Sequence, residues 1–185
     1  MKRMVCTVLL VIFLCGCGNA SALDKGMKLR NELLQSAGCD FNATVTADYG
    51  EKTYTFVMHC QTDSAGTLAF SVTEPVTIAG IEGTVDEMGG KLTFRDKALA
   101  FPNIADGLIS PVAAPWLFVH GMTGGYLKAS EQKDDGIHIV IDESYRNCAV
   151  QIDLYCDNNN IPVRGEILWE GRRIITIDVT DFTIR

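Results

Sequence analysis

CDFNATVTADYGEKTYTFVMHC, residues 39–60, is the stretch that decides the fold. Two alternating runs flank Tyr49-Gly50, a two-residue loop of the kind that closes a β-hairpin. If Phe41 lies opposite Met58, a single register sorts both runs into one apolar and one polar face. A slip by one residue would destroy this sorting. The pattern therefore predicts an antiparallel hairpin with one buried face.

The same register places Cys39 opposite Cys60 on the apolar face. At a non-hydrogen-bonded pair the two Cα atoms lie about 4.5 Å apart, which is within the reach of a disulfide. We therefore expect a Cys39–Cys60 disulfide, and the alternative is two buried free thiols. Cys148 and Cys156 stand on one apparent strand, where eight residues separate them by about 26 Å, so they cannot bond unless that strand bends.

Outward from the hairpin, the chain has a helix on one side and many short strands on the other. Apolar spacing predicts a helix over 24–37 that ends at Gly38. The turns between the later runs are too short for parallel crossovers, so we expect an antiparallel meander. Strand patterns occur near 40–48, 52–60, 66–73, 76–81, 83–87, 91–95, 98–101, 126–130, 137–143, 148–156, 162–169 and 173–183.

The segment Asn103–Gly125 interrupts this rhythm with prolines, glycines and large apolar residues, and it predicts a short helix near 111–121. The last two runs form a second hairpin. Its alternation predicts three opposite pairs: Ile167 with Ile175, Val163 with Val179, and Arg164 with Asp178.

The N-terminus has the form of a secretory leader. A cationic start is followed by the apolar run Met4–Leu14, which is too short to span a bilayer as a helix. Leu14-Cys15-Gly16-Cys17 then places a cysteine after an aliphatic residue and two small positions. This resembles the signal of bacterial lipoproteins, in which that cysteine is lipidated and becomes the mature N-terminus. The alternative is a plain signal peptide cut near residues 20–22.

The lipoprotein resemblance implies a signal peptide over 1–16, a lipid on Cys17, a tether over 17–23 and one domain over 24–185. Two or three acyl chains hold a protein firmly to a membrane. We therefore expect an exported protein anchored by its lipid, such as palmitate, on the extracytoplasmic side of a cell membrane.

The order of helix, strands, proline-bounded helical insertion and final strands resembles the LolA-like superfamily of lipoprotein carriers and lipid-binding lipoproteins. The resemblance implies an α+β, mainly antiparallel fold. A curved half-barrel sheet of about ten strands would be covered on its concave face by the N-terminal helix and a short helical lid. It further implies a non-enzymatic protein that binds an acyl chain or another hydrophobic ligand. A similar lipoprotein acts on a cell-wall amidase, so the alternative is an envelope protein that binds and regulates another protein.

The size of the expected sheet also indicates a helical lid and a groove beneath it. One helix cannot cover about ten strands, so segment 103–125 should lie over the rest of the apolar face, and a groove can form where sheet and lid meet. The alternative is that the same side chains fill an ordinary core. The candidate lining residues are Phe41, Tyr54, Phe56, Met58, Trp116 and Phe118.

Composition and motifs exclude several functions. The formal net charge of −7 and the absence of a basic patch oppose nucleic-acid binding. His59 alternates to the strand face opposite Cys60, so they cannot form a nucleophile pair, and none of the three histidines has a ligand-spaced partner for zinc. The run 157–160 does not continue as a calcium loop, because Ile161 and Pro162 stand at the fifth and sixth positions, and Asp142-Glu143 is interpreted as a surface pair. The sequence predicts no metal, no cofactor and no catalytic residue.

Overall fold

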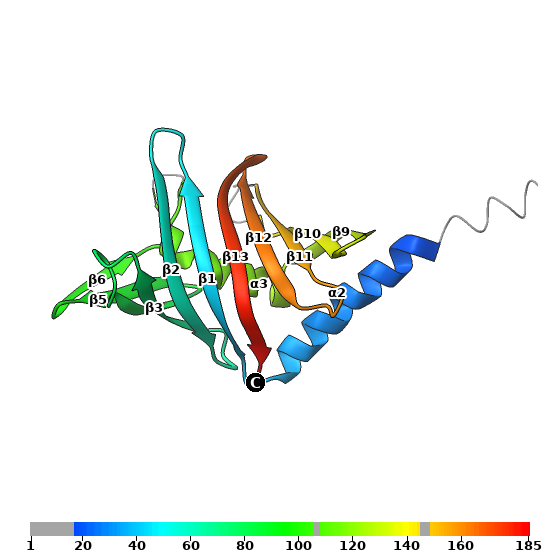
Figure 1. The fold of residues 1–185 in the computed structure, drawn as a ribbon, viewed down its shortest axis with the longest axis horizontal. Helices are drawn as coiled ribbons and strands as arrows, with labels where there is room; N and C mark the ends of the chain where they lie inside the picture. The colour runs from blue at the N-terminus through cyan, green and yellow to red at the C-terminus, as the bar shows by residue number, and fades with distance from the viewer. Residues whose placement is uncertain (1–16, 106–107, 145–148) are drawn as a thin grey trace, which may run out of the picture.

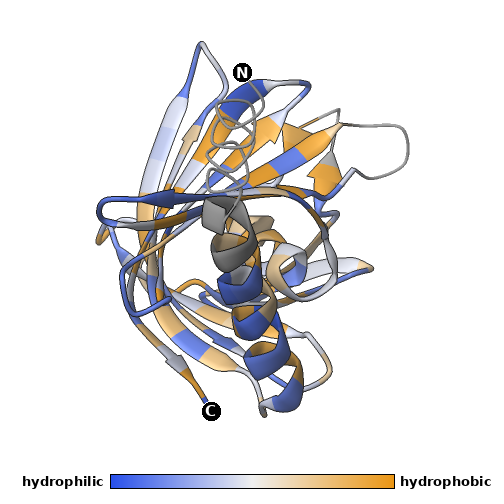
Figure 2. Cartoon of the chain, turned by 90° about the vertical axis from the view of Figure 1, so that its right-hand side faces the viewer, coloured by the Kyte–Doolittle hydropathy of each residue, from blue (hydrophilic) through white to orange (hydrophobic). Residues whose placement is uncertain are grey.

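One antiparallel sheet of eleven strands curves around two helices in the part of the chain that the structure describes (Figure 1). The structure is a computed structural model, and it describes residues 17–105, 108–144 and 149–185. Figure 2, turned to face the right-hand end of Figure 1, shows the strands bending round the helices. The predicted mainly antiparallel α+β half-barrel is confirmed.

The sheet consists of two meanders that meet in the middle. The strand order is β6-β5-β4-β3-β2-β1-β13-β12-β11-β10-β9, so β1 and β13 join the two halves, and a separate hairpin is formed by β7 and β8. The bounds are β1 Cys39–Asp48, β2 Thr53–Thr62, β3 Leu68–Glu74, β4 Glu82–Asp86, β5 Gly89–Phe94, β6 Lys97–Phe101, β7 Ile104–Ala105, β8 Leu108–Ile109, β9 Tyr126–Lys133, β10 Gly136–Asp142, β11 Val150–Cys156, β12 Pro162–Trp169 and β13 Arg172–Ile184.

Two helical segments lie inside the curve. The helix α2, Cys17–Gln35, packs along β9 and β10, and the helix α3, Ala114–Gly124, follows a 3-10 turn η2 at Pro111–Ala113. Since α3 contacts β1, β10, β12 and β13, the predicted lid is confirmed as the cover of the central strands. None of the helices in the described ranges has the length and apolar character needed to cross a bilayer.

The β1–β2 register differs from the expected one by two residues. Phe41 lies opposite Cys60, not Met58, and the strands close at Asp48 and Thr53. The loop is therefore longer than two residues: the backbone N–H of Tyr49 donates to the Lys52 carbonyl at 3.1 Å. A shift by two residues keeps every side chain on its own face, so the predicted sorting into apolar and polar faces survives the error.

The predicted Cys39–Cys60 disulfide is wrong in this structure, where both residues are buried free thiols. The shifted register removes their opposition: Cys60 faces Phe41, and the Cys39 N–H donates to the Thr62 hydroxyl at 2.8 Å. Burial raises the pKa of both thiols. Cys156 is also a buried free thiol, whereas Cys148 lies outside the described residues.

Other expectations divide between confirmation and correction. The pairs Ile167–Ile175 and Arg164–Asp178 are confirmed, while the β12–β13 ladder does not extend to a pair of Val163 with Val179. The strand expected over 76–81 is wrong, because residues 75–80 form a turn in which the Ile78 N–H donates to the Pro75 carbonyl at 3.0 Å. Helix α2 begins at Cys17, within the segment that we expected to be a tether.

Candidate functional site

The interface between the lid and the central strands is filled by aromatic side chains. Phe118 on α3 and Phe41 on β1 are fully buried, with ring centroids 6.5 Å apart in an edge-on arrangement. Phe182 packs on the other side of Phe41 at 5.6 Å. A glycine on β12 admits the Phe118 ring, since a Cβ at Gly165 would lie 2.5 Å from Phe118 Cδ2. Two of the six predicted lining residues, Phe41 and Phe118, are therefore buried against each other in the core.

The other predicted lining residues divide between the core and its rim. Met58, Phe56 and Trp116 are buried, whereas Tyr54 is 47% exposed. Tyr54 shares the apolar face at the open end of β2, where its ring lies 6.3 Å from that of Tyr49. The structure thus brings five of the six residues together in the core and leaves Tyr54 at its edge.

Three hydrogen-bonded contacts hold the lid segment to the sheet and to α2. The Trp116 indole N–H donates to the Gly66 carbonyl in the β2–β3 turn at 3.0 Å. The Tyr49 hydroxyl donates to the Ile109 carbonyl just before η2, and burial raises the pKa of Tyr49 to about 12. From α2, the Arg30 guanidinium donates to the carbonyls of Met122 and Gly125 at 2.8 and 2.5 Å.

Arg30 lies at the C-terminal end of α3, where helix carbonyls lack partners within the helix. A cation is favourable there, because the helix dipole places its negative end at the C-terminus. Burial lowers the pKa of Arg30, while the charge of Glu143 opposes that shift. Arg30 therefore links α2 to the C-terminal end of α3.

A His–Glu pair provides a further contact of the lid. His120 Nδ1 on α3 lies 2.6 Å from Glu143 Oε1, next to the end of β10, and the imidazole stacks on Trp116 with centroids 4.7 Å apart. The hydrogen bond with Glu143 raises the pKa of His120, although partial burial acts against it. The sequence interpretation of Glu143 as a surface residue is corrected, because its side chain is only 12% exposed.

The apolar face of the sheet continues beyond the lid onto β4, β5 and β6, at the left-hand end of Figure 1. Val85 on β4 is fully buried, Leu92 and Phe101 are half-buried against the same core, and Leu99 on β6 is 60% exposed. Leu92 lies opposite Leu99, and Gly90 lies opposite Phe101, so these side chains share one face. We call Leu92, Phe94, Leu99 and Phe101 the open strip.

Two glycines beside the open strip leave room for aromatic rings. A Cβ at Gly90 would lie 2.2 Å from Phe101 Cζ, and one at Gly83 would lie 2.8 Å from Phe70 Cζ. The two aromatic rings therefore lie close against bare backbone. The open strip is a shallow apolar surface continuous with the core, and sequence reasoning did not single out its residues.

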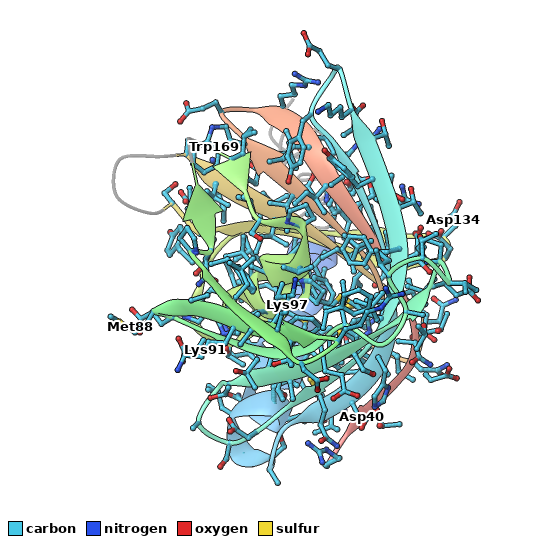
Figure 3. All side chains as sticks on the ribbon, turned by 90° about the vertical axis from the view of Figure 1, so that its left-hand side faces the viewer. Asp40, Met88, Lys91, Lys97, Asp134 and Trp169 are labelled. Atoms are coloured by element: carbon cyan, nitrogen blue, oxygen red, sulfur yellow. The ribbon has the colours of Figure 1, made fainter. Side chains whose placement is uncertain are left out.

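A hollow of about 520 Å³ lies at the same end of the sheet, but not at the predicted groove. Thr84, Lys91 and Ala100 are opposite one another on the convex side of these strands. Figure 3, which faces this end of the molecule, labels Met88 and Lys91 there. The full lining is Thr84, Asp86, Met88, Gly89, Gly90, Lys91, Ala100, Phe101 and Pro102.

No group of three His, Cys, Asp or Glu side chains is placed to hold a metal ion in the part of the chain that the structure describes. His59 and Cys60 lie on opposite faces of β2, as the alternation predicted, with Cys60 buried and His59 exposed. Asp157 Oδ1 accepts the backbone N–H groups of Asn159 and Ile161, each at 2.9 Å, so residues 157–161 form a turn.

Comparisons with known proteins place this fold. No protein-family model matches the chain, and no curated protein matches it significantly. Among solved structures, an outer membrane lipoprotein-sorting protein domain from Vibrio parahaemolyticus is similar at 8% identity and a TM-score of 0.50, over 90% of this chain and 93% of that one.

Two further similar structures are a LolA superfamily protein from Nitrosomonas europaea and the lipoprotein LppX from Mycobacterium tuberculosis. The first has 11% identity and a TM-score of 0.46, over 89% of this chain and 93% of that one. The second has 8% identity and a TM-score of 0.39, over 88% of this chain and 93% of that one. At these identities the likeness concerns the fold alone, and the curved antiparallel half-barrel of this chain is similar to the lipoprotein-sorting protein domain in fold.

Proposed function

On this LolA-like half-barrel, we propose a non-enzymatic, membrane-anchored lipoprotein that binds an acyl chain or another hydrophobic ligand on the concave face. The observation that supports it is the open strip, where the apolar face of the sheet reaches solvent at Leu99. Contiguous exposed apolar surface on a soluble domain marks a binding site more often than isolated apolar residues do.

The ligand would rest on the open strip without displacing any element. Phe41 lies under α3 and packs on Phe118 of that helix, so the use of these buried residues as a lining would require the lid to leave the sheet. Leu92 and Phe101 are already half-open beside the core. The proposal therefore moves the expected contact from the lid interface to strands β5 and β6.

Ligand binding is tested by the lipids that accompany the full chain on purification in detergent. Leu99→Asp places a charge on the open strip and is expected to reduce bound lipid at least about fivefold, because an unpaired charge against an apolar ligand costs more than 1 kcal/mol. Ala98→Asp is the matched control, since Ala98 is exposed on the other face of β6. Mass spectrometry of extracted lipid measures the result, and equal lipid in both variants would contradict the proposal.

Anchoring rests on the leader and on Cys17, whose lipidation we also propose. Cys17→Ala removes the acceptor thiol, so the protein is expected in the soluble fraction after cell lysis, while Cys156→Ala should leave it with the membranes. A Cys17→Ala protein that stays membrane-bound through alkaline washing would defeat the anchoring proposal.

A second candidate is an envelope protein that binds and regulates another protein, such as a cell-wall amidase. The favouring observation is that β6 is an edge strand with β5 as its only neighbour in the described sheet, whereas α2 packs against the other edge, β9. A free edge accepts an added strand from a partner. Co-purification with a cell-wall enzyme that is lost in a β6 variant, with no lipid bound, would favour this candidate.

A further inference from the structure

The β5–β6 hairpin, residues 89–101, carries positive charge on an acidic protein. Three cations, Lys91, Arg95 and Lys97, stand against the single acid Asp96, in a chain of formal net charge −7. Figure 3 labels Lys91 and Lys97 at this end of the molecule. The cations are not equivalent, because the strand register assigns them to different faces.

Lys97 belongs to the same face as the open strip. It lies opposite Phe94, and alternation along β6 places Lys97, Leu99 and Phe101 together. The Arg95 guanidinium carbon lies 4.9 Å from the centroid of the Phe94 ring, so this second cation is stacked on a residue of the strip. Lys91 lies opposite Ala100 and faces the convex side.

The acids of these strands are on the other face or at the tip. Glu82 lies opposite Thr93, and Asp86 lies opposite Gly89, so both belong to the convex side with Lys91. Asp96 is in the two-residue turn with Arg95, and both residues have positive φ, 66° and 48°. Within the strands β4, β5 and β6 themselves, all of which the structure describes, the concave face holds apolar residues, glycines and Lys97; Glu87, in the β4–β5 turn, is near enough to His120 on the lid for its charge to raise the pKa of that histidine.

An apolar strip that ends in two cations matches an amphiphile with an anionic head. The acyl chain would cover Leu92, Leu99 and Phe101, while a carboxylate or phosphate would accept hydrogen bonds from Arg95 and Lys97. Accordingly, and given the proposed function, we infer that the ligand is a single anionic lipid molecule whose head group is held by Arg95 and Lys97. The neutral analogue of the same chain length lacks this contact.

Native mass spectrometry of the full chain, released from detergent micelles, tests the inference with palmitate and hexadecanol as probes. Both have the same chain length, and only palmitate is anionic. The wild type is expected to show about fivefold more palmitate adduct than hexadecanol adduct, the effect of two partly exposed ionic contacts. In the Arg95→Glu/Lys97→Glu variant this preference should be lost or reversed, because two carboxylates in place of the cations repel an anionic head group. Lys91→Glu, which makes a matched change on the convex face, should keep the wild-type preference.

The head-group assignment and the binding proposal fail on different results. Equal adducts of both probes in the wild type, or loss of the preference in Lys91→Glu alone, would overturn the head-group assignment and leave the binding proposal standing. No adduct with either probe would overturn the proposed function itself. Binding to vesicles of anionic lipid that needs Arg95 and Lys97, without any palmitate adduct, would mean a membrane surface and would overturn the single-molecule inference.

Discussion

Two regions of one apolar face differ in what covers them. At β1 and β12 the face is covered by α3, and Phe41 and Phe118 meet there with no exposed surface. At β5 and β6 the same face ends in Leu99, which is 60% exposed. Both regions are built from alternating apolar residues, so their composition does not distinguish them. The core differs from the candidate site because α3 covers it.

The difference arises because the sheet is much wider than the lid is long. The helix α3 has 11 residues, about 16 Å at 1.5 Å per residue, while eleven strands spaced about 4.8 Å apart extend much farther. The fixing contacts of Arg30, Trp116 and His120 hold α3 over the central strands. The outer strands of one meander are therefore left with an open apolar surface.

Phe118→Ala should have the largest effect, because it removes a fully buried ring from the covered region. We expect the free energy of unfolding to fall by about 3–5 kcal/mol, measured by urea denaturation. Leu99→Ala in the open strip should change it by less than about 0.5 kcal/mol. Similar losses at the two positions would remove the distinction between the regions.

Gly165→Ala tests how closely the lid fits the sheet. Its Cβ would lie 2.5 Å from Phe118 Cδ2, so overpacking should lower the free energy of unfolding by about 1–3 kcal/mol. Gly124→Ala at the end of α3 is the control: its nearest neighbour is His120 at 3.8 Å, and alanine favours the helix. An unchanged free energy of unfolding in Gly165→Ala would show that Phe118 is not closely packed against β12.

The His120–Glu143 pair gives the lid a pH dependence. The hydrogen bond with Glu143 raises the folded-state pKa of His120. The stabilisation of the folded state by this pair is therefore fully present below the unfolded pKa of about 6.5, and it is lost as the pH rises through the raised folded-state pKa. The difference in the free energy of unfolding between wild type and Glu143→Gln should therefore shrink once the pH exceeds the raised pKa of His120. With His120 partly exposed, about 0.5–1 kcal/mol is expected. Thermal unfolding at pH 6 and pH 9 measures it, and a gap that widens at pH 9 would contradict the assignment.

Alternation predicted the faces of the sheet but not every pairing. Two registers of the β1–β2 hairpin that differ by two residues sort the side chains identically, so only the loop geometry could decide between them. That geometry includes the hydrogen bond from the Gly50 N–H to Asp48 Oδ1 at 2.8 Å. The expected disulfide was wrong for this reason. The pairing of β1 with β13, which brings Cys39 opposite Ile184, joins opposite ends of the domain and left no local signal.

The candidate site was harder to predict than the fold. Five of the six residues predicted to line a groove are buried in the core, and nothing in the sequence around Leu92 or Leu99 distinguishes an open position from a covered one. The contacts of Arg30, His120 and Glu143 come from three elements far apart in the chain, and adjacent positions 142 and 143 suggested only a polar surface. Coverage depends on where α3 is held, which is a tertiary property.

Photochemical labelling would show directly whether an acyl chain lies on the open strip. A palmitate analogue with a diazirine near its methyl end would be added to the full chain in detergent, irradiated, and the labelled positions mapped by peptide mass spectrometry. We expect labels within residues 89–101, on Leu92, Leu99 or Phe101, and we expect unlabelled palmitate to compete them away. Labels found only on the convex face around Lys91, or labels that no competitor removes, would contradict this expectation.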